Sequence, residues 1–171
     1  MDYSARTPVT HDRLEILKSK AKRVDHTKII DTVFKPVGIA LKDFPPDRVW
    51  VRLRKFFGTN KPSSLIKVTV QKGEYDYTKE ILGEGSDDEM IQKAKELGYE
   101  KWGVINLISE DYKLGSTKIY YQKLSHIGEF IKIDSDTKEN LDEVLKTLGV
   151  KKDEIITKNA AVLLTEKLKL I

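Results

Sequence analysis

The fold is decided by a hairpin and a following helix, with the sequence KIYYQKL at residues 118–124, SHIG at 125–128 and EFIKID at 129–134. The first and last runs are rich in β-branched and aromatic residues, and the last alternates apolar with polar side chains, which predicts two strands. The four residues between them predict a tight turn. An amphipathic helix is expected next, beginning at Asp136 and Glu139 and ending at Gly149.

The rest of the chain has the same mixed character. Further strands are expected at residues 2–7, 28–34, 48–57, 65–72, 75–82 and 103–109. Further helices are expected after Thr10, Ser86 and Thr157, whose hydroxyls can accept a hydrogen bond from the first helical turn. The first is expected to reach Val24, and the second to end at Gly98. About eight strands with few helices between them indicate an α+β fold dominated by antiparallel sheet, in one domain of residues 1–171.

Composition narrows the functional classes. The 171 residues carry 31 Lys and Arg against 27 Asp and Glu, a net charge of +4, which fits either a solvated surface or attraction to an anionic ligand. The absence of cysteine excludes disulfides, thiolate metal sites and cysteine nucleophiles. No apolar run approaches the roughly 20 residues of a transmembrane helix, so no membrane partner is expected. The N-terminus lacks an apolar leader, which favours the cytoplasm.

Basic side chains occupy one face of an expected strand. Residues two apart in a strand point the same way, so Trp50, Arg52 and Arg54 share a face. A buried arginine pair is costly unless anions meet it. This face is therefore either exposed to solvent or lines a cavity that holds acids, water or a phosphate ligand.

Several short motifs follow one another in a recognisable order. They are Arg52-Leu53-Arg54, Val70-Gln71-Lys72-Gly73, Leu97-Gly98-Tyr99, Tyr112, Ile127-Gly128-Glu129-Phe130 and Leu148-Gly149. In this order and spacing the chain resembles the CYTH superfamily, the triphosphate tunnel proteins, which include class IV adenylate cyclases and thiamine-triphosphatases. The resemblance implies an eight-stranded antiparallel β-tunnel with flanking helices. It also implies inward bases that hold a triphosphate and inward acids that hold Mg²⁺ or Mn²⁺.

The resemblance assigns roles residue by residue. The phosphate-binding bases would be Arg6, Arg52, Arg54, Lys72 and Lys132, and the metal ligands would be Asp2, Glu80 and Asp134. The chain also departs from the family pattern, because Ser4, Leu107, Ser109 and Gln122 stand where charged residues are expected. Lys132 replaces an expected acid and would repel a cation. The phosphate-binding residues of the family pattern are thus partly kept, whereas several of its metal-binding acids are missing.

Three functions stay open at this stage. The first is a CYTH-like protein that binds a triphosphate, nucleotide or polyphosphate with weakened or absent catalysis. The second is an active Mg²⁺- or Mn²⁺-dependent triphosphatase or adenylate cyclase, with Glu129 as a further metal ligand. The third is a nucleic-acid or protein interaction module that uses basic residues expected on the first helix, Lys18, Lys20, Lys22 and Arg23. A purely structural role, with the tunnel closed by its own ion pairs, is also compatible with the sequence.

Overall fold

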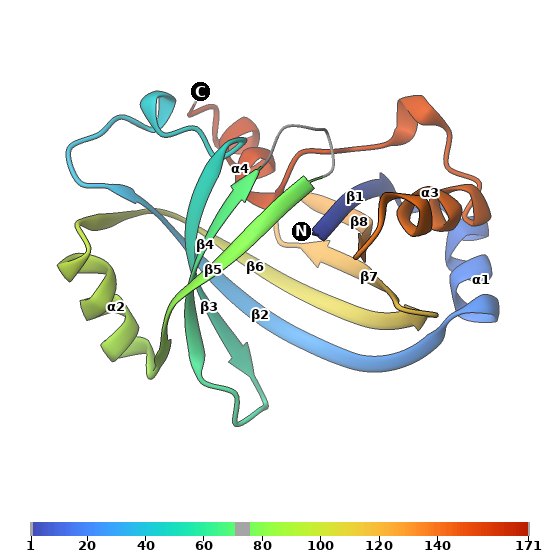
Figure 1. The fold of residues 1–171 in the computed structure, drawn as a ribbon, viewed down its shortest axis with the longest axis horizontal. Helices are drawn as coiled ribbons and strands as arrows, with labels where there is room; N and C mark the ends of the chain where they lie inside the picture. The colour runs from blue at the N-terminus through green and yellow to red at the C-terminus, as the bar shows by residue number, and fades with distance from the viewer. Residues whose placement is uncertain (1, 71–75, 171) are drawn as a thin grey trace. The chain divides into compact units, whose positions relative to one another are not determined.

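The computed structural model describes residues 2–70 and 76–170. Within these residues eight strands form a closed antiparallel β-barrel with four flanking helices, which confirms the predicted α+β fold (Figure 1). The strand order around the barrel is β1-β5-β4-β3-β2-β6-β7-β8. The strands are β1 (Asp2–Pro8), β2 (Lys22–Pro36), β3 (Val49–Phe57), β4 (Ser63–Val70), β5 (Asp76–Gly85), β6 (Tyr99–Leu114), β7 (Thr117–Leu124) and β8 (Gly128–Ser135). The helices are α1 (His11–Lys20), α2 (Asp87–Glu96), α3 (Lys138–Thr147) and α4 (Ala160–Leu168), with short 3-10 turns η1 (Leu41–Asp43) and η2 (Lys152–Glu154).

The chain divides into two compact units. One comprises residues 1–27, 72–77 and 108–158, and we call it the β8 unit. The other comprises residues 28–71, 78–107 and 159–171, and we call it the β3 unit. The strands β2, β5 and β6 contribute residues to both. None of the helices in the described part of the chain is long and apolar enough to cross a bilayer.

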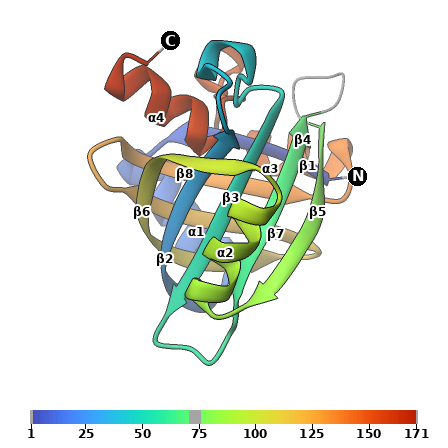
Figure 2. The same cartoon turned by 90° about the vertical axis from the view of Figure 1, so that its left-hand side faces the viewer.

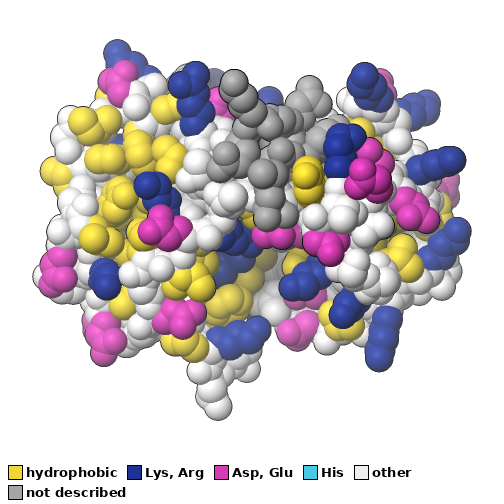
Figure 3. All heavy atoms as spheres, viewed as in Figure 1, with side chains coloured by type: hydrophobic (Ala, Val, Ile, Leu, Met, Phe, Trp, Pro, Cys, Tyr) yellow, Lys and Arg dark blue, Asp and Glu magenta, His cyan; other side chains and the backbone are white. Residues whose placement is uncertain are grey.

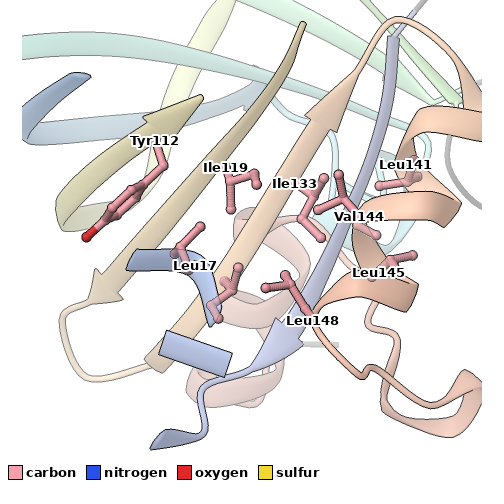
Figure 4. Packing of buried hydrophobic residues seen from close by; sticks show 10 residues of the cluster. Leu17, Tyr112, Ile119, Ile133, Leu141, Val144, Leu145 and Leu148 are labelled. Carbon is pink, nitrogen blue, oxygen red and sulfur yellow. The ribbon is translucent and has the colours of Figure 1, made fainter. Parts of the chain in front are cut away.

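The core of the β8 unit lies between its strands and the helices α1 and α3 (Figure 4). Four residues of α3 at helical spacing form its apolar face, namely Leu141, Val144, Leu145 and Leu148. They pack with Leu17 of α1 against Ile119 of β7 and Ile133 of β8. Neighbouring residues of a strand point to opposite faces. The polar residues on either side of Ile133, Lys132 and Asp134, therefore lie on the face of β8 away from the helices. In a closed barrel that face is the inner one.

The core of the β3 unit lies under α2, which crosses β3 and β4 in Figure 2. Met90 and Ala94 of α2 pack on Val51, Leu53 and Leu65. These odd-numbered residues of β3 and β4 therefore form the outer, helix-covered face. The even-numbered residues of β3 consequently lie on the inner face.

The helix α4 contacts the inner side of the β3 unit. The backbone of Gly103 in β6 lies so close to α4 that an added Cβ would stand 2.8 Å from Leu164 Cδ2 and 3.2 Å from Val33 Cγ2. A side chain at this position would push both neighbours aside, so glycine suits the close approach. The start of α4 is held by Asn159, which caps the helix and donates to the Pro46 carbonyl at 2.6 Å.

Most predicted helix ends are confirmed, and the exceptions have local causes. Thr10 and Ser86 cap α1 and α2, and Gly98 and Gly149 follow α2 and α3 with positive φ. The prediction that the first helix reaches Val24 is wrong, because the helix ends at Lys20 and β2 begins at Lys22. Two caps were also misplaced. Thr137 rather than Asp136 caps α3, and Asn159 rather than Thr157 caps α4, since each accepts from the backbone N–H three residues later.

Candidate functional site

A buried carboxylate meets two arginines on the inner face of the β3 unit. The register between β2 and β3 places Asp31 directly opposite Arg54. Arg54 Nε donates to Asp31 Oδ1 at 2.8 Å, and Arg54 Nη2 donates to Asp31 Oδ2 at 2.7 Å. Arg52 Nη1 lies 3.6 Å from the same Oδ2 atom. The Asp31 carboxylate thus orients two guanidinium groups. Its pairing with Arg54 has the bidentate geometry that arginine and carboxylate favour.

This cluster keeps a positive charge in a sheltered place. The side chains of Asp31, Arg52 and Arg54 are 1%, 7% and 20% exposed. The three side chains together carry a formal charge of +1. Coulomb interactions are stronger away from bulk water, so the cluster favours an incoming anion far more than an exposed arginine pair would.

Trp50 extends the cluster along β3. Its indole ring lies against the Arg52 guanidinium, with 4.7 Å from the Arg52 Cζ atom to the ring centroid. The side chain is buried, with 5% of the residue exposed. Its Nε1 atom is buried and has no hydrogen-bond partner among the described residues. The inner face of β3 therefore presents an indole N–H beside the two guanidinium groups.

A second basic cluster lies on the inner face of the β8 unit. The β1–β8 register pairs Arg6 with Lys132 and Ser4 with Asp134, and the β7–β8 register pairs Lys132 with Tyr120. Lys132 Nζ donates to Asp134 Oδ2 at 2.7 Å and lies 5.4 Å from the centre of the Tyr120 ring. The three ionised groups of Arg6, Lys132 and Asp134 again carry a formal charge of +1.

Arg6 is fixed by its backbone and its side chain. Its N–H and C=O pair with Ile156 at 2.8 and 2.7 Å, and its Nη1 donates to the Lys158 carbonyl at 3.1 Å. The segment that precedes α4 thus holds this arginine in a buried position, with 7% of the residue exposed. The site prediction for Arg6 came from family resemblance alone, and this pairing with Ile156 had no counterpart in the sequence pattern.

The remaining predicted site residues are more scattered. Lys72 lies outside the described residues. Asp2 is exposed at the start of β1, opposite Tyr77 of β5, and Glu80 is exposed on β5. Asp134 is bonded to Lys132. In residues 2–70 and 76–170 no three His, Asp or Glu side chains cluster as metal ligands would. The predicted ligands Asp2, Glu80 and Asp134 do not fit a Mg²⁺ or Mn²⁺ site in this structure.

Glu129, the further metal ligand considered, is engaged elsewhere. It shares a strand face with Ile131 and Ile133 and therefore lies on the side opposite Asp134. Its Oε2 accepts a hydrogen bond from the Tyr121 hydroxyl at 2.9 Å. Burial of the phenol and this bond raise the pKa of Tyr121 to about 12.

Sequence reasoning missed Asp31. It lies in the run Ile29-Ile30-Asp31-Thr32-Val33, where a lone aspartate interrupts apolar and β-branched residues. An acid in the middle of such a strand must find a cation if it is buried. That signal was present, but the arginine partner depends on pairing between strands that are distant in sequence.

The basic surface proposed for an interaction module is divided. Lys18 and Lys20 are exposed on α1, whereas Lys22 and Arg23 belong to β2, so the prediction that all four lie on one helix is wrong. On the face seen in Figure 3, Lys and Arg side chains are interspersed with Asp and Glu. This pattern is typical of a solvated surface.

Solved structures share this fold across nearly the whole chain. The PH1012 protein from Pyrococcus horikoshii OT3 has a TM-score of 0.80 at 19% identity, covering 95% of this chain and 99% of that one. A "putative adenylate cyclase" from Vibrio parahaemolyticus has a TM-score of 0.70 at 12% identity, covering 96% and 97%. A second "putative adenylate cyclase", from Bacillus halodurans, has a TM-score of 0.61 at 14% identity, covering 94% of this chain and 95% of that one.

Sequence comparison adds no closer relative. No protein-family model matches the chain, and no curated protein matches it. At identities below one fifth, the solved structures establish the fold that this chain shares with them and leave its ligand to be inferred from its own residues.

Proposed function

We propose that the chain is a single CYTH-like tunnel protein that binds a small polyanion, with weakened or absent turnover. The ligand class is a triphosphate, a nucleotide or a polyphosphate. The observation that carries the proposal is the Arg52–Asp31–Arg54 cluster, a sheltered and net cationic group on the inner face of a closed barrel. The inner cluster of Arg6, Lys132 and Asp134 supports it from the β8 unit.

The weakened turnover rests on the acids. Hydrolysis or cyclisation of a triphosphate usually needs a divalent cation held by carboxylates. In the described part of the chain, Asp31 is committed to arginine and Asp134 to lysine. Two structural neighbours carry the name "putative adenylate cyclase", so cyclase activity is the alternative that the experiment must separate.

The test compares Arg52→Gln with wild type for binding of tripolyphosphate, ATP and thiamine triphosphate by calorimetry. Arg52 is the better choice than Arg54 because Asp31 keeps both of its bonds to Arg54. We expect affinity to fall about 10- to 100-fold, the effect of one lost charge-assisted contact. Arg48→Gln, an exposed arginine just before β3, is the matched control and should bind as wild type.

Lys132→Gln repeats the test in the β8 unit. Each reaction is also assayed for released phosphate and cyclic nucleotide, with Mg²⁺ or Mn²⁺ added. Binding without product supports the proposal. Metal-dependent release of phosphate or cyclic nucleotide would refute the proposal in favour of an active triphosphatase or adenylate cyclase. Equal affinity of wild type and Arg52→Gln would refute the inner-face site.

A further inference from the structure

We infer that Trp50 is a ligand-binding residue, whose indole N–H donates to a phosphoryl oxygen of the polyanion held by Arg52. The inference rests on the proposed function and adds to it a residue outside the basic set. Trp50 is 5% exposed and its Nε1 atom is buried without an acceptor in the described part of the chain.

An unsatisfied indole N–H is unusual in a protein core. A buried tryptophan normally places its N–H on an acceptor, and a donor left without one lowers the stability of the fold. Phenylalanine would fill an apolar position without that cost. The exceptions in native structures call for a specific explanation, and a functional group awaiting its ligand is one.

The surroundings of the indole favour an anionic acceptor. Trp50 lies on the same face of β3 as Arg52 and Arg54, and the Arg52 guanidinium stands 4.7 Å from the indole centroid. Across the strand pairs, Val33 lies opposite Arg52 and Val68 opposite Trp50, so these two strand partners are apolar. A phosphoryl oxygen bound to Arg52 would meet a second donor in the indole.

The spacing of the donors suits a chain of phosphoryl groups. Residues two apart in a strand are separated by roughly 7 Å, so Trp50, Arg52 and Arg54 form a row of donors roughly 13 Å long. A linear polyphosphate can contact several members of such a row. A single orthophosphate is too short to span the whole row.

The experiment uses tripolyphosphate as the probe and the full chain as the protein. Trp50→Phe keeps an aromatic ring on β3 next to Arg52 and removes the N–H donor, together with part of the buried volume of the indole. We expect its affinity for tripolyphosphate to fall roughly ten-fold. The protein should stay folded without ligand, because loss of the unsatisfied donor offsets part of the lost packing. Trp102→Phe is the matched control, because Trp102 lies on the face of β6 opposite Gly103 and should bind as wild type.

A second readout reports on the donor itself. The chain has two tryptophans, so a ¹⁵N-labelled sample gives two indole N–H resonances, and Trp102→Phe assigns them. Tripolyphosphate should move the Trp50 resonance downfield and slow its exchange with water. This measurement stands even where Trp50→Phe fails to fold.

The failures of the two proposals differ. If Arg52→Gln loses affinity while Trp50→Phe binds as wild type and the Trp50 indole resonance does not move, the inner-face site stands and the role of Trp50 is refuted. If wild type binds no tripolyphosphate at all, the proposed function and this inference both fail.

Discussion

Arg54 donates two parallel hydrogen bonds to Asp31 across the β2–β3 pairing, from Nε to Oδ1 at 2.8 Å and from Nη2 to Oδ2 at 2.7 Å. The carboxylate is 1% exposed, whereas Arg54 is 20% exposed. Asp31 is therefore the buried member that makes two inward arginines tolerable in one place. It also fixes their orientation, which would lower the entropy cost of binding the proposed polyanion.

Asp31→Asn should destabilise the protein by about 3 kcal/mol, the lower end of the range for a broken buried ion pair, because Arg54 is partly exposed. The substitution keeps the shape of the side chain but removes the negative charge that both guanidinium groups approach. Urea unfolding measures the loss, and Asp25→Asn, on an exposed residue of the same strand, is the control.

Tripolyphosphate should raise the melting temperature of Asp31→Asn more than that of wild type, because the bound anion replaces the missing negative charge. An Asp31→Asn protein as stable as wild type in the absence of ligand would contradict the role given to this carboxylate.

Gly103→Ala should destabilise the β3 unit by about 1–2 kcal/mol, because the new methyl group would press on Leu164 and Val33. The double-mutant cycle with Leu164→Ala tests the cause. In the Leu164→Ala background the same glycine substitution should cost about 1 kcal/mol less, since the space is then open. Equal costs in both backgrounds would show that α4 does not pack on Gly103 in solution.

Stability at low pH should depend on Glu154. Its carboxylate accepts from Arg13 Nη2 at 2.7 Å and from the Lys151 backbone N–H at 3.0 Å. These bonds hold the pKa of Glu154 below its ordinary value of 4.5. The stabilisation is therefore complete above pH 4.5 and is lost as the pH falls through the lower pKa of the folded state.

Glu154→Gln should accordingly flatten the fall of the melting temperature below about pH 5. Glu143→Gln, on the exposed face of α3, is the control and should show the same fall of the melting temperature at low pH as wild type. If the melting temperature of Glu154→Gln falls with pH as that of wild type does, the contact with Arg13 contributes nothing to stability.

Local chemistry made much of the fold predictable. The alternation in residues 129–134 predicted β8, and the hydroxyls of Thr10 and Ser86 predicted the starts of α1 and α2. These features depend on neighbours within a few residues. The long strands were underestimated for the same reason. β6 runs from Tyr99 to Leu114, well beyond the predicted 103–109, because pairing with β2 and β7 extends it.

The candidate site was predicted only in part. The two-residue period placed Trp50, Arg52 and Arg54 on one face, and the structure puts that face inside the barrel. The anion that meets the arginines, Asp31, was not found, because strand register joins it to Arg54 across 23 residues of sequence. Lys132 and Asp134, which the resemblance assigned to the phosphate and the metal, are bonded to each other.

The sequence by itself determined the order of the strands and helices, most of the helix ends, and which side chains share a strand face, since these properties follow from backbone sterics and local hydrogen bonds. Only the tertiary structure decided which face is enclosed and which charges meet there. Those outcomes depend on register, on barrel closure and on the helices that cover one side, and each of these is set by contacts between residues far apart in the chain.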